Sequence, residues 1–402
     1  IQTITTKGSM SDYSFDGTVL GQHATVSDPV SGDQTWEKVV SKNLGLDLNM
    51  FNNRLSLTTD FYIRDTKGIL GKGKSLPSIY GASEPQMNAN NLRTKGYELV
   101  LGWRDSFKLA GSTFSYGITG TFSDYTAEYT KCDNPTGLIG DPYVGKKYGE
   151  IWGYKVDGLF RNDKEAAEYA SRIDLSTVAS GYYTATGAYG KGVRGGDIKY
   201  LDLNGDNIVN GGKGTLDDPG DRRVIGNSSP RYQYGASLNF SWYGFDVSVF
   251  MQGIGRLDWY PGADNLRFWG PYCRPYATFV PKNFMSQVWS EENPDAYFPR
   301  ARAYTSLNSN SGTAYYTNDR YLQNLAYCRL KNLTIGYTIP RRLTSKVGIK
   351  ECRIYFSGEN LATWSALKSD FLDPEQAAAD SDKKANVYPW CKTYSIGLNL
   401  TF

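Results

Sequence analysis

Alternation of apolar and polar residues is the feature of this sequence that most limits what the chain can fold into. In residues 55–64, apolar side chains hold most odd positions and polar side chains hold most even positions. Successive side chains of a strand point to opposite faces, so this period of two predicts a strand with one apolar and one polar face. The pattern recurs and predicts about nine strands, at residues 43–49, 55–64, 97–104, 114–122, 232–242, 245–251, 332–339, around 354–356, and 393–402.

The connections between these segments alternate between short and long. Outer-membrane β-barrels have short periplasmic turns and long external loops, whereas a soluble β-sandwich has no reason to keep that order. The sequence therefore predicts an all-β fold, an antiparallel transmembrane β-barrel with long extracellular loops. A secreted β-sandwich that binds glycans is the alternative. Short turns fall near Asn52, Lys108, Tyr243 and Lys346, and the long connections cover roughly residues 66–93, 127–229, 258–325 and 364–387.

The composition agrees with a barrel. Aromatic residues make up 14% of the chain, with 31 Tyr against 17 Phe, and several Trp and Tyr lie at strand ends, as at Trp103 and Trp242. Such residues suit the aromatic girdles of a barrel at the two membrane interfaces. No run of about 18 apolar residues occurs, which excludes a membrane-spanning helix. The net charge of +3 gives no sign of a nucleic-acid partner.

Catalysis finds no support in the sequence. His23 is the single histidine, so neither a Ser-His-Asp nor a Cys-His arrangement can form. Acidic residues such as Asp373 and Glu375 lie in long connections, where carboxylates are usually solvated, and a glycosidase would need two of them facing one cleft. We therefore expect that the protein is not an enzyme.

The strand count and the last residues indicate a piece of something larger. An odd number of strands does not close a single-chain bacterial barrel. The alternation runs to the final residue, Phe402, which resembles the C-terminal signal of outer-membrane proteins. We therefore expect the chain to be the C-terminal portion of a longer barrel protein.

Several short motifs occur in the order and spacing of one family. They are the segments 36–37 (WE), 43–47 (NLGLD), 60–66 (DFYIRDT), 143–146 (YVGK), 153–160 (GYKVDGLF), 196–200 (GDIKY), 329–333 (RLKNL), 358–361 (GENL) and the ending from Tyr388. Together they cover nearly the whole chain. The chain resembles the SusC/RagA family of TonB-dependent outer-membrane importers.

The resemblance implies a location in the outer membrane of a Gram-negative bacterium and contact with outer-membrane lipid. It implies an intact barrel of about 22 strands, with this chain as the last of them. A plug and a segment that contacts TonB would belong to the N-terminal region and are not in this sequence. It further implies a SusD-like surface lipoprotein as partner and the import of a nutrient, with an oligosaccharide favoured over a peptide.

The sharpest local motif lies in the connection 127–229. Asp202, Asn204 and Asp206 place side-chain oxygens at positions 1, 3 and 5 of a loop, and the backbone carbonyl of Ile208 stands at position 7. This spacing is typical of EF-hand-type calcium loops. Asn207 stands where such a loop normally has glycine, and asparagine also tolerates a left-handed backbone.

The last calcium ligand is less defined. The resemblance implies Asp221, which precedes Arg222 as in the family, but the insertion 211–220 adds Asp217 and Asp218 as rivals. The alternative is a turn rich in Asp and Asn with no metal. We keep structural Ca²⁺ as the expected cofactor.

Aromatic residues in the long connections are candidates for contact with a substrate or a partner. Aromatic faces pack on sugar rings and Tyr, Trp and Arg dominate protein interfaces, while the alternative is that these residues pack the loops together. The candidates are Trp152, Tyr154, Arg267, Phe268, Trp269 and Tyr272.

Overall fold

The computed structural model describes residues 4–7, 23–26, 32, 34–72, 79, 85–184, 192–273, 280, 282–302, 306–307, 312–369, 371–379, 388 and 390–402. The chain forms two compact units. The first comprises residues Ile1–Asn43, Tyr62–Lys95 and Thr126–Lys147, and the second comprises Leu44–Phe61, Gly96–Tyr125 and Tyr148–Phe402. Each unit is described by itself below.

A nine-stranded antiparallel sheet dominates the fold, and its strands follow one another in chain order. Each of the nine segments predicted from the alternation lies in a strand of its own, so the predicted strand count is confirmed. The strands are β3 (Lys38–Met50), β4 (Leu55–Lys72), β5 (Gln86–Leu109), β6 (Ser112–Lys131), β11 (Arg231–Trp242), β12 (Phe245–Arg256), β15 (Tyr327–Thr338), β16 (Glu351–Ser365) and β17 (Thr393–Thr401).

All four short turns lie where the sequence predicts them. Ala110 and Gly111 have φ of 50° and 85°, and Tyr243 and Gly244 have φ of 49° and 83°. Two consecutive residues with positive φ form the type I′ turn that matches the twist of a two-residue hairpin. The fourth connection is a short helical turn, made by α4 (Arg341–Thr344) and the 3-10 helix η5 (Ser345–Val347).

The predicted connection 66–93 is wrong in its bounds, because β4 continues to Lys72 and β5 begins at Gln86. In the first unit these strand ends carry polar contacts, such as the Arg93–Asp65 ion pair at 2.7 Å and the bond from Asn88 Nδ2 to the carbonyl of Gly68. A strand that has water on both faces needs no alternation, so the sequence pattern stops before the strand does.

The first unit also contains a separate hairpin and an anchored loop. β1 (Ile4–Lys7) pairs with β2 (His23–Val26) in antiparallel register. After β6, the ammonium group of Lys146 donates hydrogen bonds to the carbonyls of Ile139, Gly140 and Asp141. These bonds close residues 139–146 into a compact turn.

In the second unit, the register places like residues on like faces. Val247 pairs with Phe240 on one side and with Ile335 on the other, and Ile335 pairs in turn with Phe356. One position along β12, Ser248 pairs with Asn239 and Thr334. One face is therefore apolar and the opposite face is polar, as predicted.

The apolar face is exposed rather than packed on a second sheet in the described part of the chain. Ile396 is 84% exposed and Leu398 is 55% exposed. This arrangement rejects the β-sandwich alternative, in which two sheets bury their apolar faces against each other. No helix among the described residues is long and apolar enough to cross a membrane.

Aromatic rings form a band near each end of the apolar face. Phe245 and Tyr337 lie 4.6 Å apart near the short turns, and Phe122 stacks on Tyr232 at 6.5 Å towards the other end. Between Tyr232 and Trp242, β11 rises about 33 Å. At the tilt usual for barrel strands this spans about 25 Å of height, the thickness of the apolar band of such barrels.

One irregularity changes which residues face inwards on β15. Phe250 of β12 pairs with Asn332, but Met251 pairs with Leu330, so Lys331 is an extra residue. Such a β-bulge shifts the alternation by one position. As a result Arg329, which pairs with Gln252, lies on the same polar face as Asn332 although the two are three positions apart.

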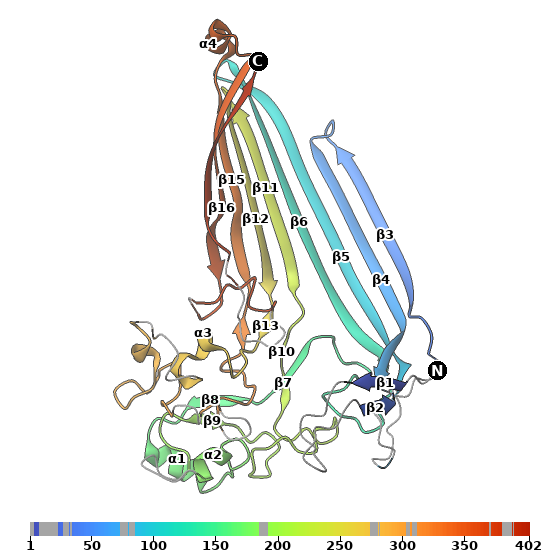
Figure 1. The fold of residues 1–402 in the computed structure, drawn as a ribbon, viewed down its shortest axis with the longest axis vertical. Coiled ribbons are helices and arrows are strands. Elements are labelled where there is room, and N and C mark those ends of the chain that lie inside the picture. Colours follow the sequence, from blue (N-terminus) through green and yellow to red (C-terminus); the bar gives the residue numbers. More distant parts are fainter. Residues whose placement is uncertain are drawn as a thin grey trace. The chain divides into compact units, whose positions relative to one another are not determined.

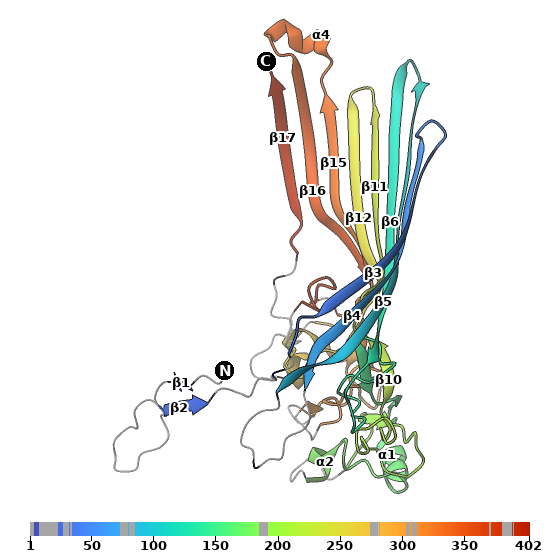
Figure 2. The same cartoon turned by 90° about the vertical axis from the view of Figure 1, so that its right-hand side faces the viewer.

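The second unit also contains a compact assembly that we call the loop domain, the described residues of 148–230 and 257–326. Figures 1 and 2 show its helices at one end of the sheet, with α4 and the C-terminus at the other. Its core contains completely buried residues, among them Phe160, Tyr200 and Trp269. Its elements are β7 (Glu150–Gly153), β8 (Val156–Leu159), α1 (Asp163–Ala170), α2 (Ser180–Thr184), β9 (Ile198–Tyr200), β10 (Arg223–Asn227), β13 (Asp258–Trp259), α3 (Leu266–Trp269), η2 (Gly270–Tyr272), η3 (Met285–Gln287) and β14 (Gln323–Asn324).

Candidate functional site

The predicted calcium loop has a closely hydrogen-bonded backbone. Asp202 accepts bonds from the backbone N–H of Gly205 at 2.7 Å and of Asn207 at 2.9 Å. Asp206 accepts from the N–H of Ile208 at 2.8 Å. Asn207 has φ of 65°, the left-handed conformation expected for this position. These bonds hold the loop in a tight curve.

The ligand side chains of this loop lie together. The amide Nδ2 of Asn204 donates to Asp206 at 3.0 Å, and the amide oxygen of Asn204 accepts from the backbone N–H of Asp206 at 3.1 Å. Two carboxylates, an amide and the carbonyl of Ile208 form the kind of oxygen set that calcium prefers. The described residues contain no cluster of three or more His, Cys, Asp or Glu placed for a metal ion. The donor types fit calcium, and its binding stays a prediction.

Asp221 joins the two ends of the loop by hydrogen bonds. It is completely buried, and its carboxylate accepts bonds from the N–H groups of Leu203 at 2.7 Å and Asn210 at 2.9 Å. Both ends of the loop are therefore tied to one side chain. Of the two rivals, Asp217 is exposed and Asp218 is half-buried.

Three of the predicted aromatic contacts lie in the core of the loop domain. Phe268, Trp269 and Tyr272 are 3%, 0% and 2% exposed. Trp269 donates its indole N–H to the carbonyl of Gly262, and the hydroxyl of Tyr272 donates to Pro299. This burial matches the alternative that these residues pack the loops together, and it leaves them no exposed ring face for a ligand.

Arg267 contacts the connection between β16 and β17. Its guanidinium donates to the carbonyl of Phe371 at 3.4 Å, and the hydroxyl of Ser369 donates to the carbonyl of Arg267 at 3.5 Å. A small cavity of about 80 Å³ lies between these segments. Arg267 therefore links α3 to residues 366–379, a segment that we call the strap.

The strap is fixed to the polar face of the sheet by buried ion pairs. Arg329 is 2% exposed and bonds to Asp373 and Glu375, each at 2.7 Å. Lys331 bonds to Glu375 at 2.8 Å. The expectation that Asp373 and Glu375 are solvated was wrong, because the bulge in β15 turns two cations towards them.

Trp152 and Tyr154 lie in the wall of an open cleft of about 430 Å³ in the loop domain. Burial raises the pKa of Tyr154 to about 12, and its ring packs edge-on against Tyr316 at 5.9 Å. The sequence did not indicate the other lining residues as a group. They are Gly153, Gly211, Gly212, Lys213, Gly214, Arg222, Tyr315, Tyr316 and Thr317.

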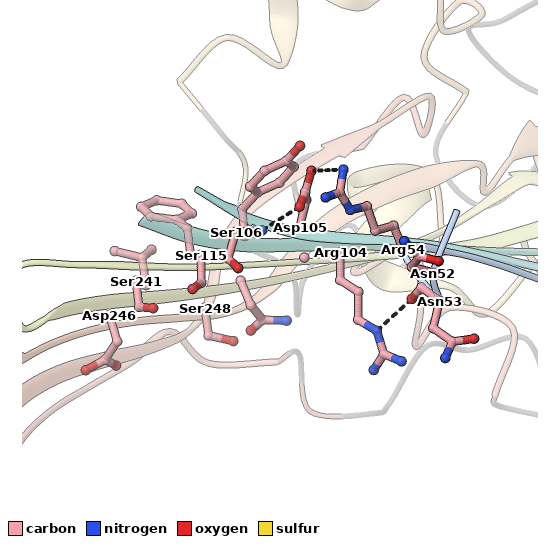
Figure 3. A pocket seen from close by; sticks show the side chains of 15 residues that line it. Asn52, Asn53, Arg54, Arg104, Asp105, Ser106, Ser115, Ser241, Asp246 and Ser248 are labelled. Carbon is pink, nitrogen blue, oxygen red and sulfur yellow. Dashed lines mark hydrogen bonds and ion pairs between the residues drawn. The ribbon is translucent and has the colours of Figure 1, made fainter. Parts of the chain in front are cut away.

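A second, larger groove of about 800 Å³ lies at the short-turn end of the sheet. Figure 3 shows its polar side chains, including Arg54 paired with Asp105 at 3.2 Å and Arg104 donating to the carbonyl of Asn53 at 3.1 Å. Asp246 at its margin forms an ion pair with an arginine on β16. A charged, hydrogen-bonding surface of this kind suits an aqueous or protein-filled barrel interior.

Known proteins share both the sequence and the fold. No family model matches the chain. The chain is 25% identical to the TonB-dependent receptor P3 of Formosa agariphila over 97% of its own length and 36% of that protein. It is 22% identical to the TonB-dependent receptor SusC of Bacteroides thetaiotaomicron over 91% of its length and 32% of that protein. It thus spans about a third of the length of these curated relatives.

Among solved structures, the RagAB peptide transporter aligns with the whole chain and 38% of its own chain, with a TM-score of 0.68 and 20% identity. This likeness shows the fold, and the likeness in sequence is to the TonB-dependent receptors above. Together with the two-faced sheet, the exposed apolar band and the loops gathered at one end, they show that this chain is SusC/RagA-like, similar to TonB-dependent receptors of the Gram-negative outer membrane.

Proposed function

We propose that the intact protein imports a nutrient across the outer membrane in a TonB-dependent manner. The observation that carries this proposal is the sheet with one lipid-facing and one polar face, with a folded loop domain at one end. A sheet of this kind suits the wall of a barrel with a polar interior, and the loop domain would then recognise the substrate at the entrance of the barrel. TonB would act through the N-terminal region of the intact protein.

We propose a SusD-like surface lipoprotein as the partner at the loop domain. The named relatives SusC and RagAB support it. The loop domain also presents exposed apolar side chains, such as Val224 at 47% and Met285 at 69% exposure. Apolar side chains that remain exposed on a folded loop domain suit contact with another protein.

We propose an oligosaccharide as the substrate class. Support comes from the cleft of Trp152, whose open part includes Tyr315, 36% exposed. Aromatic ring faces of this kind pack on the apolar faces of sugar rings. RagAB is named a peptide transporter, and its likeness to this chain concerns the fold.

We also propose a structural Ca²⁺ held by Asp202, Asn204, Asp206, the carbonyl of Ile208 and Asp221. Bound there, the ion would supply a positive centre that fixes the loop beside the cleft. Asp221 is the best placed of the candidate last ligands because it already joins both ends of the loop.

Growth measurements test the importer function directly. A strain that lacks the intact gene should lose growth on the cognate oligosaccharide and keep growth on its monosaccharide, which passes through general porins. The complemented strain should recover. Loss of growth on peptides with normal growth on oligosaccharides would show that the substrate is a peptide and not an oligosaccharide. Normal growth on every polymer would reject import as the function.

A further inference from the structure

The cleft in the loop domain has a rigid frame. The N–H of Tyr154 donates to the carbonyl of Thr317 at 2.9 Å, and the N–H of Asp319 donates back to Tyr154 at 3.1 Å. A Cβ at Gly153 would lie 2.6 Å from the carbonyl oxygen of Thr317, so only glycine permits this approach. The two walls are therefore held at a fixed separation.

The side chains that line the cleft carry positive charge and no carboxylate. Lys213 is exposed at its rim, and Arg222 lies under the glycine-rich segment 211–214. The guanidinium lies flat against Gly211, whose added Cβ would be 3.1 Å from Cζ, and its Nη2 donates to the carbonyl of Gly211 at 2.8 Å. The neighbouring Asp221 is turned away, towards the backbone N–H groups of Leu203 and Asn210.

Two donors of the cleft lack a protein acceptor. Among the described residues, neither the indole Nε1 of Trp152 nor the Nε of Arg222 has a hydrogen-bond partner, and both atoms are buried. A buried N–H without an acceptor destabilises the folded state unless another molecule supplies the oxygen. Both belong to residues that line the same cleft.

Ring faces complete the site. Tyr316 is fixed by its hydroxyl, which donates to the carbonyl of Thr177 at 2.9 Å, and Tyr315 packs edge-on against it at 5.6 Å. The volume of about 430 Å³ lies within the range of small-molecule sites. Aromatic faces next to cationic donors suit a sugar ring that carries a negative group.

We propose that this cleft binds the carboxylate-bearing unit of an acidic oligosaccharide, a hexuronate residue. The carboxylate accepts hydrogen bonds from Arg222 and from the indole of Trp152, Lys213 adds attraction at the rim, and the pyranose ring packs on Tyr315. This inference rests on the proposed import function and names the charge class of its substrate.

Binding to the purified intact receptor in detergent tests the proposal. Trigalacturonate, the neutral trisaccharide maltotriose and triglutamate are titrated separately at constant ionic strength, and heat is measured. Trigalacturonate should bind at least about tenfold more tightly than maltotriose, the effect expected of hydrogen bonds to a charged group. Equal affinity for the two sugars would overturn the role of charge, and tighter binding of triglutamate would overturn the sugar.

Two variants test the donors separately. Trp152→Phe keeps a ring and removes the N–H, and Arg222→Lys keeps the charge and removes the Nε donor. Each should weaken trigalacturonate about tenfold. Arg172→Gln is the matched control, because Arg172 is exposed in the same domain and pairs with Glu168 at 4.0 Å. Unchanged affinity in Trp152→Phe with a normally folded barrel would reject the site.

The experiments distinguish rejection of the hexuronate site from rejection of the proposed import function. If no acidic sugar binds while the gene deletion still abolishes growth on a neutral oligosaccharide, the cleft assignment falls and import stands. If the deletion strain grows normally on every polymer, import falls, and the titrations still decide whether the cleft binds hexuronate.

Discussion

The sheet and the loop domain of the second unit solve the burial of apolar side chains in opposite ways. The main cluster of buried hydrophobic residues extends from Tyr154 to Ala377 and lies in the loop domain and the strap. On the sheet, Ile396 and Leu398 stay exposed to the surroundings of the chain. The loop domain is therefore stabilised by its own core, whereas the sheet depends on lipid to cover its apolar face.

Truncating a buried side chain in the core of the loop domain should show the largest difference in stability between the loop domain and the sheet. Trp269→Ala removes a completely buried ring and should destabilise that domain by about 3–5 kcal/mol. Limited proteolysis should then cut within residues 148–230 or 257–326, while the barrel keeps its resistance to heat in detergent on a gel. A simultaneous loss of barrel resistance would show that the two regions fold as one.

Removing the anchor of the strap should give the next largest effect. Arg329→Met leaves the carboxylates of Asp373 and Glu375 without their buried partner, which costs about 3 kcal/mol. Protease should gain access to the strap. Arg172→Gln, an exposed arginine of the loop domain, is the control. Unchanged protection in Arg329→Met would mean that Arg267 and the packing of Phe371 suffice to hold the strap.

The two faces of the sheet can be compared by one substitution at neighbouring positions. Leu398 pairs with Ile354 on the apolar face, and Asn399 pairs with Arg353 on the polar face. Leu398→Arg should cost about 2–4 kcal/mol near the bilayer midplane, whereas Asn399→Arg should be tolerated. The fraction of heat-resistant folded barrel measures the cost. Equal loss in the two variants would contradict the assigned faces.

Calcium should affect the loop domain alone, and by the smallest amount. Asp202→Ala combined with Asp206→Ala, or removal of the ion by a chelator, should raise hydrogen exchange in residues 202–221 without changing the barrel. The double variant should no longer respond to added calcium. The proposed ion is disproved if the intact protein itself shows no calcium-dependent protection there.

The sequence predicts those parts of the molecule that depend on neighbours along the chain. The strands, the short turns and the faces follow from a period of two, which residues 55–64 already display. The strap and the cleft depend on residues far apart, such as Arg329 with Asp373 and Tyr154 with Thr317. A signal was present for the strap: two cations separated by one residue interrupt the alternation of β15, and two acids with the same spacing occur at Asp373 and Glu375.

The bulge at Lys331 keeps the residues on both sides of it on the correct faces of β15. Successive side chains of a strand point to opposite faces. One inserted residue would therefore exchange the inner and outer faces for every residue beyond it, unless a bulge absorbs the insertion. With Lys331 bulged out, Leu330 stays beside Met251 on the apolar face and Arg329 stays beside Gln252 on the polar face, whereas a regular ladder that paired Lys331 with Met251 would send Arg329 into the lipid and Leu330 into the interior. Insertions and deletions in the long connections cause no such exchange. Length variation among related chains should therefore be confined to the connections, or be absorbed inside a strand by a bulge of this kind.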